Sequence, residues 1–160
     1  MQRLTTFTVN GTRYEHMIQA NQTLLDFVRR TLGLTGSKES CGTGDCGSCS
    51  MLVDGQVVKS CLMLAVEVDG KDVTTIEGLS ADGRLHPIQE AFVRNWGTQC
   101  GYCTPGFVVT AKALLDRNPT PTDEEIKHAT AGNLCRCTGY VKIIDSIKDA
   151  AKMMQEKRDS

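Results

Sequence analysis

The sequence predicts an α+β protein with a strand-rich first half and a helical second half. Up to about residue 76, short apolar runs alternate with polar residues and are separated by tight-turn dipeptides. From about residue 86, apolar residues recur instead at the spacing of amphipathic helices. The eight cysteines also divide into two sets of four, one set in each half.

A turn-rich stretch, Gly78–Gly83, separates the two halves and holds no cysteine. We therefore predict one domain over residues 1–76, a linker over 77–84 and a second domain over 85–160. Domains of roughly 75–80 residues bury little apolar surface and benefit from a bound metal or a partner.

The first half begins with a predicted hairpin and a helix. A first strand ends at Asn10-Gly11, a dipeptide typical of tight turns, and a second strand spans residues 13–18. Thr23 is the predicted N-cap of a helix that ends at Gly33.

Four further strands are predicted after the first cysteines. Residues 51–53 and 56–58 flank a turn dipeptide and form a second hairpin, and residues 66–68 and 73–76 add further strand signal. Strands on both sides of one helix predict a small sheet with the helix across one face.

The second half predicts a bundle of four short helices. The first starts near residue 86, and Thr104 is the predicted N-cap of the second because a proline follows it. Thr122 and Glu125 form a capping box for the third helix, and the fourth begins near Tyr140. The cysteines of this half fall between these helices.

The first four cysteines have the spacing Cys41-x4-Cys46-x2-Cys49, with Cys61 following after 11 residues. This is the plant-type spacing for a [2Fe–2S] cluster. Three glycines lie between the first three cysteines: Gly42, Gly44 and Gly47. Glycine allows the backbone to curl around a cluster and to bring N–H groups toward its sulfurs, so we expect these residues to form the cluster loop.

The second set consists of Cys100-x2-Cys103 and Cys135-x-Cys137. Each pair lies at a predicted helix end, and Cys103 lies just before the second helix. A helix N-terminus favours nearby thiolates because its free N–H groups carry positive partial charge. Two such pairs that meet in a bundle could hold a second four-thiolate site.

Two other uses of the cysteines stay open at this point. Disulfides need an oxidising compartment, and the N-terminus shows no secretory signal. Structural zinc is the stronger alternative, since two close cysteine pairs are common zinc ligands and Cys-x-Cys is not diagnostic. The glycine-rich spacing of the first set disfavours zinc there. A zinc-binding adaptor without a redox role is therefore the second functional hypothesis.

Composition excludes several other classes of function. Eighteen basic and 19 acidic side chains give a net charge of −1, which gives no reason to expect nucleic acid as a partner. No apolar run approaches the roughly 18 residues that span a bilayer. We accordingly expect no membrane span and a cytoplasmic location.

Three segments of the chain resemble one family. They are CGTGDCGSC at residues 41–49, QCGYCTPG at residues 99–106 and GNLCRCTGY at residues 132–140. In this order and at these separations they resemble the iron–sulfur subunit of the molybdenum hydroxylase family, also called the xanthine oxidase family. Three serines depart from the commonest pattern, and none is a ligand: Ser40, Ser48 and Ser50.

The resemblance implies a specific architecture and a specific task. It implies an N-terminal β-grasp, ferredoxin-like domain and a C-terminal four-helix bundle, each with one [2Fe–2S] cluster. It implies a large molybdopterin-binding partner subunit and a medium FAD-binding subunit. Electrons would pass from molybdenum through the helical-domain cluster and the ferredoxin-domain cluster to FAD or another acceptor. Gln99 and Cys137 match positions that contact the pterin, and no residue of this chain would be catalytic.

Overall fold

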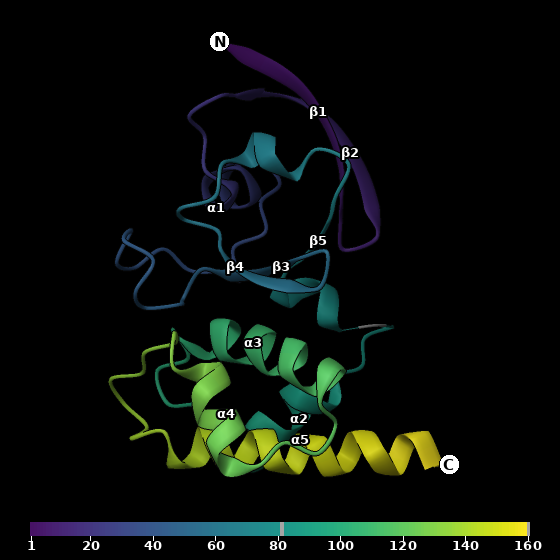
Figure 1. Ribbon diagram of the computed structural model, residues 1–160, viewed down its shortest axis with the longest axis vertical. Helices are drawn as coiled ribbons and strands as arrows, with labels where there is room; N and C mark the ends of the chain where they lie inside the picture. Colours follow the sequence, from purple (N-terminus) through teal and green to yellow (C-terminus); the bar gives the residue numbers. More distant parts are fainter. Residues whose placement is uncertain (81, 160) are drawn as a thin grey trace.

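The computed structural model describes residues 1–80 and 82–159. The molecule is elongated, with the sheet-bearing half at one end and the helical half at the other (Figure 1). The N-terminus lies at the far end of the sheet. The last helix crosses the opposite end of the molecule and carries the chain to its C-terminus.

The first two strands form the predicted hairpin. Strand β1 (Gln2–Val9) pairs antiparallel with β2 (Thr12–Gln19) along its whole length. Asn10 and Gly11 both have positive φ angles, 51° and 79°, as a two-residue type I′ turn requires. The hairpin prediction is confirmed.

Three short strands complete the sheet: β3 (Ser50–Val53), β4 (Gln56–Lys59) and β5 (Asp72–Thr74). Within the described residues the strand order is β2-β1-β5-β3-β4. Strands β3 and β4 form the second predicted hairpin. Strands β1 and β5 run parallel, with Val9 opposite Val73, whereas the other strand pairs of the sheet are antiparallel. The result is one mixed sheet.

A short helix covers one face of this sheet. It runs through α1 (Leu24–Asp26) and continues as one wide π-helical turn, η1 (Phe27–Thr31). The Thr23 hydroxyl accepts a hydrogen bond from the Asp26 N–H at 3.1 Å, so the predicted N-cap is confirmed. The helix buries its apolar side chains in the core of the first half.

Two strand predictions need correction. Residues 66–68 lie in a 3-10 helix, η2 (Ala65–Val68), because the Glu67 carboxylate accepts the Leu64 N–H at 2.7 Å and closes a turn. Strand β5 ends at Thr74 instead of residue 76. Residue 76, predicted as the last residue of this strand, is instead the first residue of a second 3-10 helix, η3 (Ile76–Leu79).

The described part of the second half contains four α-helices: α2 (Pro87–Arg94), α3 (Thr104–Arg117), α4 (Asp123–Thr130) and α5 (Val141–Asp159). The predicted N-cap at Thr104 is wrong. Thr104 is already the first residue of α3, and its hydroxyl bonds to the hydroxyl of Thr98 instead. None of the described helices is long and apolar enough to cross a membrane.

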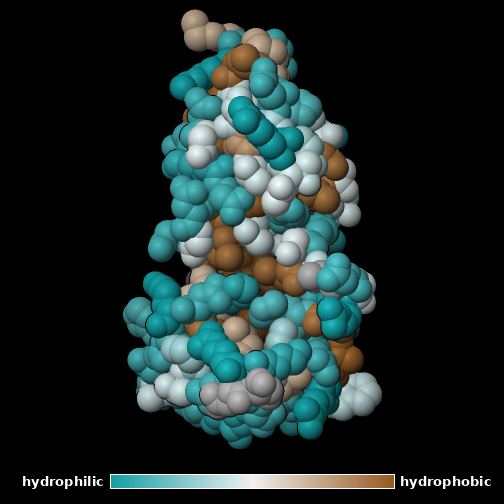
Figure 2. All heavy atoms as spheres, turned by 90° about the vertical axis from the view of Figure 1, so that its right-hand side faces the viewer, coloured by the Kyte–Doolittle hydropathy of each residue, from teal (hydrophilic) through white to brown (hydrophobic). Residues whose placement is uncertain are grey.

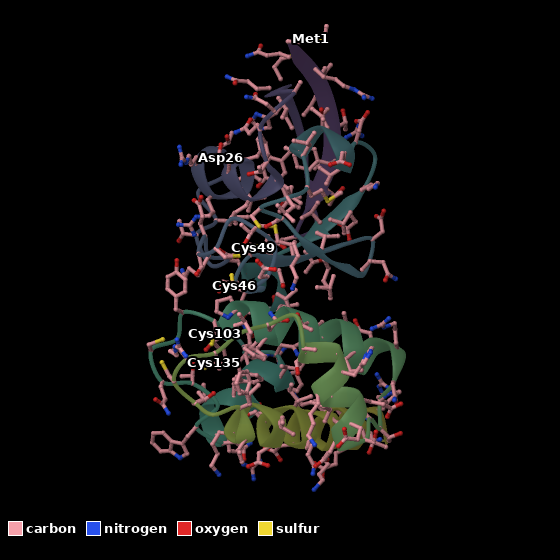
Figure 3. The ribbon with its side chains drawn as sticks, turned by 60° about the vertical axis from the view of Figure 1, so that its left-hand side comes forward. Met1, Asp26, Cys46, Cys49, Cys103 and Cys135 are labelled. Carbon is pink, nitrogen blue, oxygen red and sulfur yellow. The ribbon has the colours of Figure 1, made fainter. Side chains whose placement is uncertain are left out.

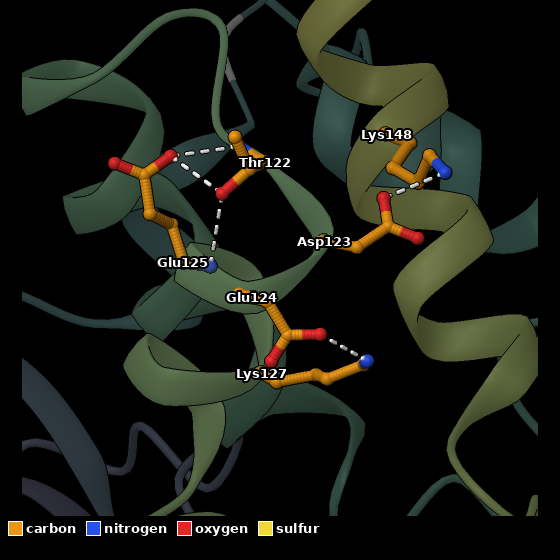
Figure 4. Close-up of polar contacts among 6 residues, drawn as sticks. All are labelled: Thr122, Asp123, Glu124, Glu125, Lys127 and Lys148. Atoms are coloured by element: carbon orange, nitrogen blue, oxygen red, sulfur yellow. Dashed lines mark hydrogen bonds and ion pairs between the residues drawn. The ribbon is translucent and has the colours of Figure 1, made fainter.

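The capping box of α4 is present as predicted (Figure 4). The Glu125 carboxylate accepts the Thr122 N–H at 2.7 Å, and the Thr122 hydroxyl accepts the Glu125 N–H at 3.3 Å. Next to it, Asp123 forms an ion pair with Lys148 at 2.7 Å. This pair joins the start of α4 to α5.

Two hydrophobic cores lie along the molecule, and they meet at the sheet. One core lies between the helix and the sheet of the first half. The other belongs to the helices but also includes Leu52 of β3. Hydrophobic atoms are visible at the waist between the halves, within a mainly hydrophilic surface (Figure 2). The predicted linker, residues 77–84, overlaps η3, and its Ala81 lies outside the described residues.

Candidate metal centres

The first four cysteines come together at the edge of the sheet that faces the helical half. Cys49 directly precedes β3 and Cys61 follows β4, so the hairpin brings their sulfurs to 3.4 Å. The Ser60 hydroxyl donates to the Cys49 carbonyl at 2.6 Å and ties the residue before Cys61 to Cys49. A β-hairpin therefore positions one half of the first thiol set.

The other two thiols of this set lie on the preceding loop. The N–H groups of Thr43 and Cys46 donate to the Cys41 sulfur at 3.4 and 3.5 Å. The loop can curl in this way because the glycines between the cysteines have positive φ angles, 68° at Gly42 and 84° at Gly44. N–H groups that face a sulfur stabilise its negative charge.

The electrostatic environment within this set is uneven. Hydrogen bonds from Thr43 and the Cys46 backbone lower the pKa of the Cys41 thiol to about 6. Burial, reinforced by the neighbouring Cys49 thiol, raises the pKa of Cys61 to about 11. At neutral pH Cys41 is therefore mainly a thiolate, whereas Cys61 keeps its proton, which a bound metal would have to displace.

The last four cysteines lie on two loops of the helical half. Cys100 and Cys103 lie between α2 and α3, and Cys135 and Cys137 lie between α4 and α5. The loops face each other, so that the sulfurs of Cys100 and Cys137 are 3.6 Å apart. Cys103 and Cys135 form the second contact between the loops.

Here too the pKa values of the thiols are shifted in opposite directions. Burial disfavours the charged form of Cys135, but hydrogen bonds from Thr138 and from the Cys137 N–H outweigh it and lower its pKa. The Thr138 hydroxyl lies 3.1 Å from the Cys135 sulfur. Burial raises the pKa of Cys103 to about 12, and the hydrogen bond with Cys100 raises that of Cys137.

In each set, one pair of sulfurs lies at a separation that suits two ligands of one metal ion. Two thiolates on one tetrahedral metal at about 2.3 Å lie roughly 3.8 Å apart. The measured sulfur separations, 3.4 and 3.6 Å, are close to this value. Among the described residues, no three His, Cys, Asp or Glu side chains are arranged to hold one metal ion. In the second set the thiols lie as two pairs, Cys100 with Cys137 and Cys103 with Cys135, and a [2Fe–2S] cluster would place two thiolates on each iron.

The two sets face each other across the boundary between the halves. Cys46 and Cys49 lie on the lower edge of the first half, above Cys103 and Cys135 (Figure 3). The Leu134 N–H donates to the Cys46 carbonyl at 2.9 Å. A cavity of about 460 Å³ is lined by cysteines of both sets.

One edge of the second set faces solvent. Cys100, Cys137 and the adjacent Gln99 are all exposed. Sequence reasoning missed the donors Thr43 and Thr138, although each follows a cysteine ligand candidate within three positions. For Thr138 the signal is a hydroxyl residue three positions after a cysteine, whereas Thr43 donates its backbone N–H, which the glycine before it allows to turn toward the sulfur.

Comparison with known proteins agrees with two clusters. The family model for a 2Fe-2S iron-sulfur cluster binding domain matches residues 7–79, and that for a [2Fe-2S] binding domain matches residues 75–148. The nicotinate dehydrogenase small FeS subunit of Eubacterium barkeri is 46% identical over 90% of this chain and 92% of its own length.

Solved structures have the same fold. Quinoline 2-oxidoreductase from Pseudomonas putida 86 superposes with a TM-score of 0.92 at 40% identity, covering 97% of each chain. Aldehyde oxidoreductase from Desulfovibrio gigas gives a TM-score of 0.92 at 43% identity, covering 98% of this chain and 17% of that longer one.

Fold and cysteine sets together define an iron–sulfur protein with two [2Fe–2S]-binding regions. The likeness to a small FeS subunit extends over nine-tenths of both chains at 46% identity, which is enough to assign the family. The chain belongs to the iron–sulfur small subunits of the molybdenum hydroxylase family. Both matching family models describe [2Fe–2S] domains, and nothing in the comparisons favours the zinc adaptor.

Proposed function

We propose that this chain is the electron-transfer subunit of a molybdopterin-dependent hydroxylase or dehydrogenase complex. The observation that carries the proposal is the contact between the two four-cysteine sets. The carbonyl of Cys46 in the first set accepts the N–H of Leu134, the residue directly before Cys135 in the second set. When bound, [2Fe–2S] clusters supply one-electron redox chemistry.

The residues of this chain hold and tune the clusters. Cys41, Cys46, Cys49 and Cys61 are the proposed ligands of the first cluster, with Gly42, Gly44 and Gly47 shaping its loop. Cys100, Cys103, Cys135 and Cys137 are the proposed ligands of the second. The N–H and hydroxyl donors at Cys41 and Cys135 stabilise negative charge on these sulfurs and so favour the reduced state. We assign the chain no catalytic residue.

The partner assignments follow from exposure and from the relatives. We assign Gln99 and Cys137 to contact with molybdopterin on a large partner subunit, since this edge of the second set is open to solvent. The longer aldehyde oxidoreductase chain, of which this chain covers 17%, supports a larger assembly. We propose that a medium FAD-binding subunit accepts the electrons from the cluster of the first cysteine set. The proposed use of all eight cysteines as cluster ligands favours a reducing compartment, and we propose the cytoplasm as the location.

Strand order and helix arrangement support the finer fold assignment. We assign the mixed sheet with its crossing helix to the β-grasp fold and α2 to α5 to a four-helix bundle. The proposed domains stay at residues 1–76 and 85–160, with 77–84 as the linker.

Metal analysis of the purified chain tests the proposal directly. We expect about four iron and four inorganic sulfide per chain, with a red-brown colour, because two sets of four thiolates each hold a [2Fe–2S] cluster. A colourless protein with stoichiometric zinc and no sulfide would establish the adaptor hypothesis instead.

Paired substitutions test which cluster lies next to molybdenum. In the complex, Cys137→Ser should impair the second cluster and the exit of electrons from molybdenum, while the first cluster still forms. Cys41→Ser is the matched variant and should leave the magnetic coupling between Mo(V) and the second cluster intact. Wild-type electron transfer in the Cys137→Ser complex would show that the proposed order is wrong.

A further inference from the structure

Asn133 is a buried amide side chain that joins the two halves. The residue is 3% exposed. The amide Nδ2 donates to the Gly47 carbonyl at 3.0 Å, and Oδ1 accepts the Thr110 hydroxyl at 3.0 Å. One group of this amide therefore binds the loop of the first cysteine set, while the other is held by α3.

The neighbouring residue continues the same contact. Asn133 donates to the carbonyl of Gly47, and Leu134 donates to the carbonyl of Cys46. Two consecutive residues of one loop thus bind two consecutive carbonyls of the other. Each of these loops carries proposed ligands: Cys46 belongs to the first set, and Cys135 directly follows Leu134.

Glycines allow the two loops to touch through their backbones. A Cβ atom on Gly106 of α3 would lie 2.3 Å from the Gly47 carbonyl oxygen. One on Gly47 would lie 2.3 Å from the Gly132 carbonyl oxygen. Both are backbone atoms that cannot rotate away, so only glycine permits this approach. At the exposed rim, Lys59 Nζ donates to the Gly132 carbonyl at 2.7 Å.

We propose that Asn133 is a positioning residue that sets the separation of the two clusters, an inference that rests on the proposed function. A buried hydrogen-bonded amide is orientationally specific, and breaking one of its bonds leaves the partner unpaired. Asn133 holds the Cys46–Gly47 carbonyls against the loop that leads into Cys135. With both clusters bound, one electron would pass from the second to the first, and the rate of this transfer would depend on the loop separation that Asn133 maintains.

Two substitutions disturb this contact in different ways. Asn133→Asp keeps the acceptor for Thr110 but replaces the donor to Gly47 by a carboxylate oxygen. Gly106→Ala introduces no charge and favours the helix intrinsically, yet its methyl group pushes against the Gly47 carbonyl. Lys59→Met is a mild third variant, since its bond lies at the exposed rim and its loss should not prevent folding.

Asn95→Asp is the matched control. It makes the same amide-to-carboxylate change in the helical half, where Asn95 Nδ2 donates to Asp149 at 2.7 Å. It destabilises the packing of α2 on α5 and leaves the contact between the loops alone.

The experiment uses the full chain with its clusters and combines two readouts. In Asn133→Asp and Gly106→Ala, hydrogen exchange of the peptide containing Leu134 should accelerate by roughly 5- to 30-fold, and in Lys59→Met by less. The magnetic interaction between the two reduced clusters should weaken in the same order, with iron and sulfide content unchanged. In Asn95→Asp, hydrogen exchange of the α2 amides should become faster, while the magnetic interaction between the reduced clusters stays at its wild-type value.

Unchanged exchange at Leu134 and unchanged magnetic interaction in iron-loaded Asn133→Asp and Gly106→Ala would overturn the inference. So would an equal weakening of the interaction in Asn95→Asp, since the effect would then be one of general stability. If Asn133→Asp does not fold, Gly106→Ala and Lys59→Met decide the question. Failure of the proposed function has a different signature, namely zinc without sulfide in the wild-type chain.

Discussion

Trp96 occupies a backbone position that favours glycine. It follows α2 with a φ angle of 57°, and it lies in a Schellman motif in which the Gly97 N–H donates to the Phe92 carbonyl at 2.9 Å. The residue is 80% exposed, so packing does little to offset the left-handed conformation.

We expect Trp96→Gly to stabilise the isolated chain by about 1 kcal/mol, because the strain of the left-handed position disappears. In thermal unfolding, the Tm should rise by roughly 2–4 °C. Trp96→Ala is the control, since it removes the ring but keeps a Cβ at positive φ. An equal rise in both variants would show that the backbone conformation is not the cause.

The environment of His86, the N-cap of α2, predicts that the stability of the fold depends on pH. Its Nδ1 accepts the Ile88 N–H at 3.2 Å, which requires the neutral ring. Burial, assisted by Lys112, lowers the pKa of His86 below its usual 6.5. A lowered pKa in the folded state means that the stabilisation is present above pH 6.5 and is lost as pH falls through the folded-state value.

The variant His86→Asn should therefore lose less stability than the wild type as pH falls from about 7 to about 5, since asparagine caps the helix without titrating. Denaturant unfolding at each pH measures the difference. His128→Asn, at an exposed histidine of α4, is the control. Parallel stability profiles for the wild type and His86→Asn would contradict this prediction.

At the scale of elements, local signals decided most helix and turn boundaries. The capping box of α4 and the type I′ turn at Asn10-Gly11 depend on residues within four positions of each other, and both are present. The strand prediction at residues 66–68 failed because Glu67 bonds to the Leu64 backbone and closes a turn. A run of apolar residues is compatible with a strand or a 3-10 helix, and here a side chain decided between them.

The capping box of α4 gives the element-scale prediction. Thr122→Ala should lower the free energy of unfolding by about 1 kcal/mol, because the Glu125 N–H loses its acceptor. Hydrogen bonds from the Thr122 backbone N–H and from its hydroxyl hold the pKa of Glu125 below its usual value, so losing the hydroxyl alone should raise this pKa part of the way. Chemical denaturation and NMR titration measure the two effects. Thr120→Ala, an exposed site two positions earlier, should change neither.

At the scale of the whole molecule, the clusters are expected to contribute to stability. Each half is small, and in each the thiols of separate segments lie close together, as Cys49 and Cys61 do in the first and Cys100 and Cys137 in the second, so a bound cluster would cross-link these segments. Ligand binding to the folded state alone stabilises by about 4 kcal/mol at 1,000-fold excess over Kd.

Removal of iron by a chelator should therefore lower Tm by roughly 10 °C. The Cys137→Ser chain, with one cluster intact, should melt between the two-cluster and cluster-free forms. Calorimetry with parallel iron analysis makes the comparison. Equal Tm values with and without iron would show that the halves fold without their clusters.

The sequence by itself determined the class of elements in each half, the two cysteine sets and the family. These depend on spacing along the chain: turn dipeptides, caps and cysteine intervals act over a few residues. The roles of Gln99 and of the eight cysteines as contacts and ligands stay predictions that metal analysis and substitution will test.

Only the tertiary structure decided how distant segments meet. The parallel pairing of β1 with β5 joins residues more than 60 positions apart. The same holds for the contact of Asn133 with Gly47, 86 positions apart, which gives an otherwise ordinary asparagine its importance. Such contacts depend on which surfaces pack once the chain has collapsed, and no periodicity records them. The sequence thus identified the two sets of cysteines, whereas tertiary packing decided that the two sets lie against each other.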